Sequence, residues 1–246
     1  MEELYLLRTK NLAIFSQLQI EEALLRLDER PVLLVNEGSC PTIVLGISSP
    51  LEEHVHTSLV AKNALPLVRR FSGGGTVIVD EETIFCTWIL PRGYQGLALF
   101  PEELLLWSHG IYERAFPESG LALDEHDFVL GKRKCGGNAL YFRKERGLLH
   151  TSFLWDFSLE NMRYLTIPTK APAYRAGRGH RDFLTPLSAH FVSKDRFMDA
   201  FFSLIKREFL VRELSLKEAY SIQKRPYRAS TTKIVLTKKK PYHLGP

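Results

Sequence analysis

Hydrophobic and polar positions along the chain follow two spacings, one helical and one typical of strands. Residues 16–28 carry leucines on one side and precede Pro31, which predicts an amphipathic helix that ends before the proline. Residues 101–115 begin with Pro-Glu-Glu, and because proline suits a first helical turn and acids complement the helix dipole, we expect a second helix there. Short apolar and β-branched runs indicate strands at residues 32–35, 42–47, 76–79, 83–90, 127–130, 138–142 and 148–154.

Two of these runs lie close together along the chain. Residues 76–79 and 83–90 are separated only by residues 80–82, which read Asp-Glu-Glu, so we predict a β-hairpin. A single helix is expected at about 51–63, before the first of the two runs.

The last third of the chain has a different character. Prolines and glycines punctuate a basic connector, and helices are expected at about 193–209 and 215–222. Residues 215–218 form a Ser-Leu-Lys-Glu capping box, which supports the start of the last helix. Paired strands with helices between them and a helical end predict the α+β fold class. We expect a single domain over residues 1–246, with the connector and the helical segment at about 166–246.

Composition narrows the class of protein. At 246 residues, with 45% hydrophobic and 25% charged residues, the chain can form one globular domain with a proper core. The sparse, odd set of Cys40, Cys86 and Cys135 argues against a secreted disulfide framework. The N-terminus is acidic and no apolar run approaches the roughly 18 residues of a membrane span, so a cytoplasmic location without a membrane partner is expected. The net charge of +5 favours acidic partners such as nucleotide phosphates, an acidic protein domain or nucleic acid.

A glycine triplet is the first candidate for chemistry. It lies in the segment Arg69-Arg70-Phe71-Ser72-Gly73-Gly74-Gly75-Thr76, just before a β-branched run. Glycines adopt positive φ and can direct successive N–H groups at one point, which suits a phosphate or a carboxylate. The segment is neither a Walker loop nor a dinucleotide fingerprint, because a strand follows it. A tight turn between strands is an equally good interpretation of the triplet by itself.

A second basic, glycine-rich segment favours the anion-binding interpretation. It reads Gly131-Lys132-Arg133-Lys134-Cys135-Gly136-Gly137-Asn138-Ala139. By itself a Lys-Arg-Lys cluster is usually a solvated turn, and paired glycines usually mark a bend or a bulge. Two such segments in one chain offer two backbone surfaces for the two ends of one phosphorylated ligand.

These segments, in this order, resemble the motifs of the lipoate-protein ligase family. The family's Arg-Arg-x-Ser-Gly-Gly-Gly-x-Val motif corresponds to residues 69–77, its Asp and Gly-x-x-Lys-x-x-Gly-x-Ala motif to 127–139, and its His-x-x-hydrophobic strand to 150–154. The likeness extends from the N-terminal helix to Leu154. It implies a class II synthetase-like domain, as in lipoate and biotin ligases, with a mixed or antiparallel sheet flanked by helices. The chain looks like a short branch of the family without the C-terminal accessory domain.

The resemblance implies an ATP-driven acylation. Lipoate is activated as lipoyl-AMP by ATP with Mg²⁺, and the lipoyl group passes to a lysine of a lipoyl domain, in a 2-oxoacid dehydrogenase complex or in the glycine cleavage H protein. Lys134 matches the catalytic lysine of the family, and its compact ammonium suits contact with the acyl carbonyl and the α-phosphate. No metal-ligating cluster of side chains is expected. The expected contacts with adenylate or lipoate are Arg70, Ser72, Gly73, Gly74, Gly75, Thr76, Asp127, Gly137, Ala139 and His150.

Other interpretations remain open. Related octanoyltransferases carry the acyl group on a cysteine, and Cys135 is a candidate for that role, although packing in the core is preferred. A basic nucleic-acid-binding domain is an alternative from another class, against which stands the absence of interleaved aromatic and basic strands. The basic-aromatic segment 174–181 is interpreted as a solvated linker rather than a cover for a nucleotide. Without an accessory domain, activation is expected to be slower than transfer or to need a separate accessory protein.

Overall fold

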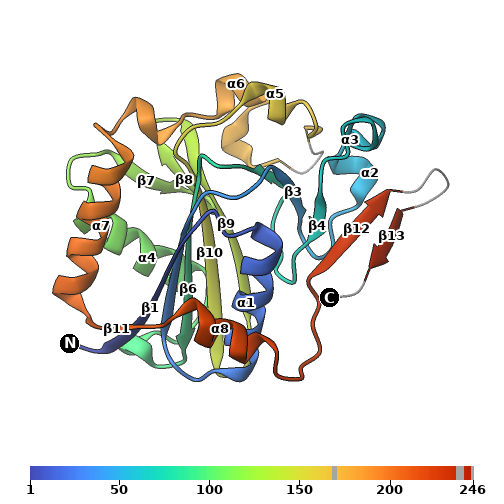
Figure 1. Ribbon diagram of the computed structural model, residues 1–246. Helices are drawn as coiled ribbons and strands as arrows, with labels where there is room; N and C mark the ends of the chain where they lie inside the picture. The colour runs from blue at the N-terminus through green and yellow to red at the C-terminus, as the bar shows by residue number, and fades with distance from the viewer. Residues whose placement is uncertain (168–170, 237–240, 245–246) are drawn as a thin grey trace.

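The computed structural model describes residues 1–167, 171–236 and 241–244, which form two sheets flanked by helices (Figure 1). Within this described part of the chain the larger sheet has eight strands. Their order is β11 (Leu210–Glu213), β1 (Glu3–Lys10), β2 (Val32–Glu37), β6 (Thr83–Pro91), β10 (Arg146–Leu154), β9 (Arg133–Phe142), β8 (Asp127–Leu130) and β7 (Leu121–Asp124). β11, β1 and β2 are parallel neighbours, and from β2 onward the strands pair antiparallel.

The smaller sheet joins segments that lie far apart in the sequence. Its order in the described residues is β13 (Pro241–Leu244), β12 (Thr232–Leu236), β4 (Leu67–Arg69), β3 (Thr42–Leu45) and β5 (Val77–Val79). β3 and β4 are parallel, and the other pairs are antiparallel. The C-terminal part of the chain, which is expected to be helical, therefore also supplies strands to both sheets.

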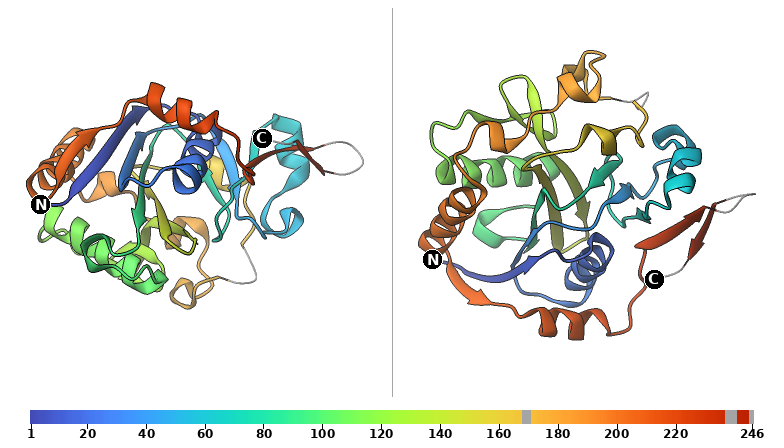
Figure 2. Two further views of the ribbon diagram at one scale, coloured as in Figure 1. Left: turned by 90° about the horizontal axis from the view of Figure 1, so that it is seen from below. Right: turned by 45° about the horizontal axis from the view of Figure 1, so that its top comes forward.

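Helices cover both faces of the larger sheet. The α-helices of the described residues are α1 (Ile14–Leu27), α2 (Leu51–His54), α3 (Thr57–Asn63), α4 (Pro101–Ala115), α5 (Leu159–Met162), α6 (His180–Phe183), α7 (Lys194–Glu208) and α8 (Leu216–Gln223). α4 and α7 pack on one face, and α1 and α8 pack on the other (Figures 1 and 2). Leu33 and Val35 of β2 belong to the first core, whereas Val32 and Leu34 belong to the second. This alternation follows from the period of a strand, and it makes the central strands nearly continuous apolar runs.

The predicted hairpin between residues 76–79 and 83–90 is wrong. β5 pairs with β3 in the smaller sheet, and β6 pairs with β2 and β10 in the larger one. The chain changes sheets at Asp80, whose carboxylate accepts hydrogen bonds from the amide of Glu82 (3.1 Å) and the hydroxyl of Thr83 (3.4 Å). β6 is buried at all positions except its last, because it lies at the centre of the larger sheet and pairs with two long neighbours.

The other local predictions have mixed outcomes. α4 spans the predicted residues, and α1, α7 and α8 are confirmed within two residues at each end. The single helix predicted at 51–63 is instead two short helices, because Val55 between them is extended and forms a β-bridge with Leu165. The strands that the sequence analysis does not predict are β1, β4, β7, β11, β12 and β13. The α+β class is confirmed, and among the described residues no helix is long and apolar enough to cross a membrane.

Candidate active site

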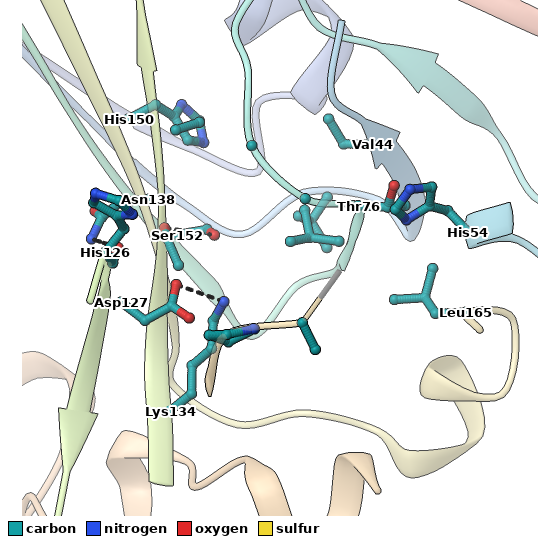
Figure 3. A pocket seen from close by; sticks show the side chains of 18 of the residues that line it. Val44, His54, Thr76, His126, Asp127, Lys134, Asn138, His150, Ser152 and Leu165 are labelled. Atoms are coloured by element: carbon teal, nitrogen blue, oxygen red, sulfur yellow. Dashed lines mark hydrogen bonds and ion pairs between the residues drawn. The ribbon is translucent and has the colours of Figure 1, made fainter. Parts of the chain in front are cut away.

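A cavity of about 420 Å³ lies where the two sheets meet. Its walls come from β3 and β5 of the smaller sheet, from β6, β8, β9 and β10 of the larger sheet, and from residues within 165–166 and 171–183. Figure 3 shows the polar side chains that gather around it. The predicted site residues among those that line it are Arg70, Gly74, Gly75, Thr76, Asp127, Lys134, Gly137, Ala139 and His150. Ser72 and Gly73 are not among the lining residues.

The glycine loop, residues 70–76, connects β4 with β5 and packs closely against its neighbours. Gly74 has a φ of 97°, a conformation that favours glycine. A Cβ atom at Gly74 would lie 2.8 Å from Nη2 of Arg70, and a Cβ atom at Gly46 would lie 2.2 Å from the carbonyl oxygen of Gly74. Neither glycine can therefore accept a side chain unless the loop moves.

Arg70 shapes this loop from inside the protein, where it is only 4% exposed. It donates to the carbonyl of Gly73 through Nε (3.1 Å) and Nη2 (2.7 Å), and to the carbonyl of Gly75 through Nη2 (2.7 Å). The N–H of a trans peptide points opposite to its C=O, so these bonds turn the amides of Gly74 and Thr76 away from the guanidinium. Burial lowers the pKa of Arg70 to about 10, while Glu21 acts in the opposite direction. The group therefore stays charged at neutral pH, and it fixes the loop that the sequence motifs predict to bind an anion.

Lys134 lies on β9 and forms an ion pair with Asp127 on β8. Its Nζ is 2.8 Å from Oδ1 of Asp127 (Figure 3). The other carboxylate oxygen, Oδ2, accepts a hydrogen bond of 2.8 Å from the hydroxyl of Tyr174. Burial and the charge of Asp127 raise the pKa of Tyr174, so this hydroxyl is neutral and donates. Asp127 thus orients the ammonium of Lys134 and is itself held by Tyr174.

A β-bulge puts Lys134 and Gly137 on the same face of β9. The register between β8 and β9 shifts so that Cys135 is the extra residue. Residues three apart in a regular strand point to opposite faces, but one bulged residue between them brings them to the same face. A Cβ atom at Gly137 would lie 3.0 Å from Nζ of Lys134. Glycine at this position therefore leaves the space through which the lysine side chain passes.

His150 on β10 is held by a buried carboxylate. Its Nδ1 lies 3.0 Å from both carboxylate oxygens of Glu21 on α1. Glu21 also accepts hydrogen bonds of 2.7 Å from the hydroxyl of Thr87 and from the amide of Gln17. Because Nδ1 faces a carboxylate it carries a proton, which leaves Nε2 as the nitrogen that Glu21 does not engage. Sequence reasoning does not single out Glu21, because a glutamate on an amphipathic helix is usually exposed.

The cysteines, all within the described residues, do not form a reactive centre. Burial raises the pKa of the Cys86 and Cys135 thiols to about 12, whereas a nucleophilic cysteine needs a lowered pKa. Sγ of Cys135 donates to the carbonyl of Phe128 at 3.4 Å. Cys40 is exposed and is not among the residues that line the cavity. The positions favour packing as the role of Cys135.

The segment 174–181 is not the solvated linker that the sequence favours. The hydroxyl of Tyr174 bonds to Asp127, and Arg175 is buried and lines the cavity. The sequence signal for a role of this segment in the site is Tyr174 among basic residues. Nothing in the local sequence, however, distinguishes a buried arginine such as Arg175 from a solvated one.

The fold matches solved lipoate-protein ligases. A structure of lipoate-protein ligase A bound with ATP gives a TM-score of 0.71 at 19% identity, covering 91% of this chain and 93% of that one. The bi-partite lipoate protein ligase of an archaeal lipoylation system from Thermoplasma acidophilum gives a TM-score of 0.73 at 19% identity, covering 91% of each chain. At this identity the likeness concerns the fold, and it confirms the class II synthetase-like architecture.

A family model identifies the chain more closely. The model of the lipoyl protein ligase A/B catalytic domain matches residues 13–209, and the chain belongs to that family. The inactive lipoate–protein ligase 2 of Plasmodium falciparum is 24% identical over 241 residues, covering 74% of this chain and 62% of that protein. The lipoate-protein ligase LplJ of Bacillus subtilis is 28% identical over 149 residues, covering 59% of this chain and 44% of that protein. The chain thus spans less than two thirds of the length of these curated relatives.

Gly74→Val is expected to weaken the binding of lipoyl-AMP, the ligand that the sequence motifs imply, by about tenfold or more, because a side chain would penalise the positive φ and displace the loop. Isothermal titration calorimetry measures this affinity. Gly120→Val is the matched control, since Gly120 also has a positive φ of 73°, a Cβ atom there meets nothing within 4 Å, and the residue does not line the cavity. Normal binding by the Gly74 variant would mean that the loop is only a turn.

At mildly alkaline pH a thiol reagent is expected to modify Cys40 alone in the folded protein, because burial keeps the other two thiols protonated and inaccessible. Intact mass spectrometry counts the adducts, and unfolding in urea provides the control in which all three thiols react. Rapid modification of Cys135 in the folded protein would contradict its assignment to the core.

Proposed function

We propose that this chain acts as a lipoate-protein ligase: it binds lipoate as lipoyl-AMP in the cavity and transfers the lipoyl group to a lysine of a lipoyl domain. The observation that carries the proposal is Lys134, which Asp127 holds at the same cavity that the glycine loop lines. Membership of the lipoyl protein ligase A/B catalytic family supports it. Because one relative is named inactive and another is named a ligase, the site residues of this chain decide the proposal.

The chemistry has two steps, and both need fixed positive charge. In activation a carboxylate oxygen of lipoate attacks the α-phosphate of ATP and pyrophosphate leaves. In transfer the ε-amine of the acceptor lysine attacks the acyl carbonyl and AMP leaves. Negative charge develops on the oxygens at the reacting centre in each step, and a preorganised donor there contributes about 2.7–4 kcal/mol. We assign this role to Lys134, because its ammonium is oriented before the substrate arrives.

The glycine loop is proposed to bind the adenylate phosphate through the backbone amides of Gly74 and Thr76, which point away from the guanidinium of Arg70. Ser72, Gly73, Gly75, Thr76, Gly137, Ala139 and His150 remain the further contacts that the family resemblance implies. Mg²⁺ is proposed to enter with ATP. Among the described residues no group of His, Cys, Asp or Glu is arranged to hold a metal, and Mg²⁺ commonly binds substrate phosphates, waters and only one or two carboxylates.

The acceptor is proposed to be a lipoyl domain of a 2-oxoacid dehydrogenase complex or the glycine cleavage H protein. In support, the archaeal ligase of this fold was studied together with its E2 lipoyl domain. We also propose that residues 1–246 act as one catalytic domain. Ile14, Lys134 and Arg175 line the same cavity although they come from the start, the middle and the last third of the chain.

An octanoyl or lipoyl transferase of the same fold is the second candidate. A route through a cysteine thioester has no support from the structure, because Cys135 is buried in the core with a raised pKa. A transferase that accepts a preformed acyl-adenylate uses the same contacts as the second step of the ligase reaction.

Lys134→Ala is expected to lower acyl transfer to a lipoyl domain by about a hundredfold or more while the fold is retained, because the variant lacks the cation at the reacting centre. Intact mass of the acceptor measures transfer, and circular dichroism checks the fold. Lys132→Ala is the control, since Lys132 lies two residues away and is exposed. Equal losses in the two variants would contradict the assignment.

We expect transfer from synthetic lipoyl-AMP to be faster than the overall reaction from lipoate and Mg-ATP. Alternatively, the overall reaction is expected to need a separate accessory protein. The contacts described above serve the acyl-adenylate and the incoming lysine, whereas activation also needs the pyrophosphate of ATP to be held in line. The two rates are compared with the same acceptor. If they are equal, the chain activates lipoate by itself.

A further inference from the structure

Arg175 is a buried cation at the cavity whose hydrogen-bonding groups are only partly used. It ends the 3-10 helix Ala173–Arg175, lines the cavity and is 6% exposed. Its Nε donates to the carbonyl of Arg178 at 2.9 Å, and its guanidinium carbon lies 4.6 Å from the ring centre of Phe183. Its Nη2 is buried and has no hydrogen-bond partner among the described residues. The side chain is therefore oriented, yet one arm of its donor fork is unused.

The carboxylates at the cavity are engaged elsewhere. Glu125 and Asp127 line it, but Asp127 pairs with Lys134, and Glu125 accepts hydrogen bonds from the amides of Ala173 (2.6 Å) and Tyr174 (3.4 Å). A buried charge is unfavourable unless it is paired and hydrogen-bonded. Among the described residues, Nη2 of Arg175 thus has no hydrogen-bond acceptor, and no carboxylate accepts a hydrogen bond from its guanidinium.

The charge of Arg175 affects the pKa of a neighbouring histidine. Burial lowers the pKa of Arg175, and burial together with the charge of Arg175 lowers the pKa of His180, which also lines the cavity. Among the described Asp, Glu, Lys and Arg side chains that line the cavity, three are basic (Arg70, Lys134 and Arg175) and two are acidic (Glu125 and Asp127), so the lining has one more positive than negative group. An anion in the cavity would balance this charge.

Hydrogen bonds attach Arg175 to the strands that carry the reacting lysine. Tyr174 bonds to Asp127, and Arg178 donates to the carbonyl of Lys132 (2.8 Å) and to the carbonyl of Tyr174 (2.7 Å). The position of Arg175 is thereby tied to β8 and β9. A group bound by Arg175 would have a defined place relative to Lys134.

We propose that Arg175 binds a phosphate of the nucleotide through its free guanidinium arm, as a positioning and binding residue of the site. This inference rests on the proposed function and deepens it. The planar fork of arginine matches phosphate oxygens in charge and geometry. The glycine loop offers backbone amides to the nucleotide, and Arg175 adds a charged donor from a separate segment of the chain.

The test compares ligand affinities of Arg175→Gln with those of the unaltered protein by isothermal titration calorimetry. We expect the Kd for Mg-ATP to rise about 10- to 100-fold, the range for losing a hydrogen bond to a charged group. The Kd for lipoate, which has no phosphate, is expected to change by less than about threefold. Arg181→Gln removes the same charge from an exposed position of the same segment and is expected to bind Mg-ATP normally.

The outcomes separate this inference from the proposed function. If the unaltered protein binds Mg-ATP and Arg175→Gln binds it equally well, the inference alone is overturned. Equal weakening of lipoate and Mg-ATP would also overturn it, because Arg175 would then hold the acyl carboxylate or only support the cavity. If the unaltered protein binds neither Mg-ATP nor lipoyl-AMP, the proposed function falls too. Should the glutamine variant not fold, Arg175→Lys keeps the charge without the fork, and an unchanged Mg-ATP affinity in it would equally contradict the proposal.

Discussion

The buried guanidinium of Arg70 is the group on which the geometry of the site depends. Its guanidinium donates to the carbonyls of Gly73 and Gly75, so the hydrogen bonds that stabilise the buried charge also determine the shape of the glycine loop. Because peptide planes are rigid, fixing these carbonyls also fixes the direction of the amides that follow them. Gly46 closes the loop from the other side by backbone contact with Gly74. The loop is therefore preorganised, which is the condition under which backbone dipoles stabilise an anion effectively.

The same principle applies to Lys134 on the larger sheet. The bulge at Cys135 turns its side chain onto the face of Gly137, and Asp127 then holds the ammonium in one position. Tyr174 links this pair to a segment that the chain reaches some forty residues later. The bulged register of β9, the absence of a side chain at Gly137 and the hydrogen bond from Tyr174 thus orient the side chain of Lys134. Without them this flexible side chain would lose more conformational entropy when a ligand binds.

The cavity exists because two neighbouring runs of the sequence enter different sheets. β5 joins the smaller sheet and β6 joins the larger one, and Val79 and Phe85, from these two strands, both line the cavity. A hairpin between β5 and β6 would have paired the two walls with each other. The turn at Asp80 makes the separation possible, since its carboxylate satisfies the backbone and hydroxyl donors that follow it.

The sequence by itself determined the features that act over a few residues. Proline and acids set the start of α4, the glycine triplet marked the loop in which Gly74 has a positive φ, and the order of the motifs indicated the family. Only the tertiary structure decided which strand pairs with β6, that Glu21 lies buried under His150 at 129 residues' separation, and that Arg175 is buried at the cavity. All three features depend on contacts between segments that lie far apart in the sequence. A local pattern does not reveal such contacts, because the same residue types at the same spacing are equally stable on a solvated surface.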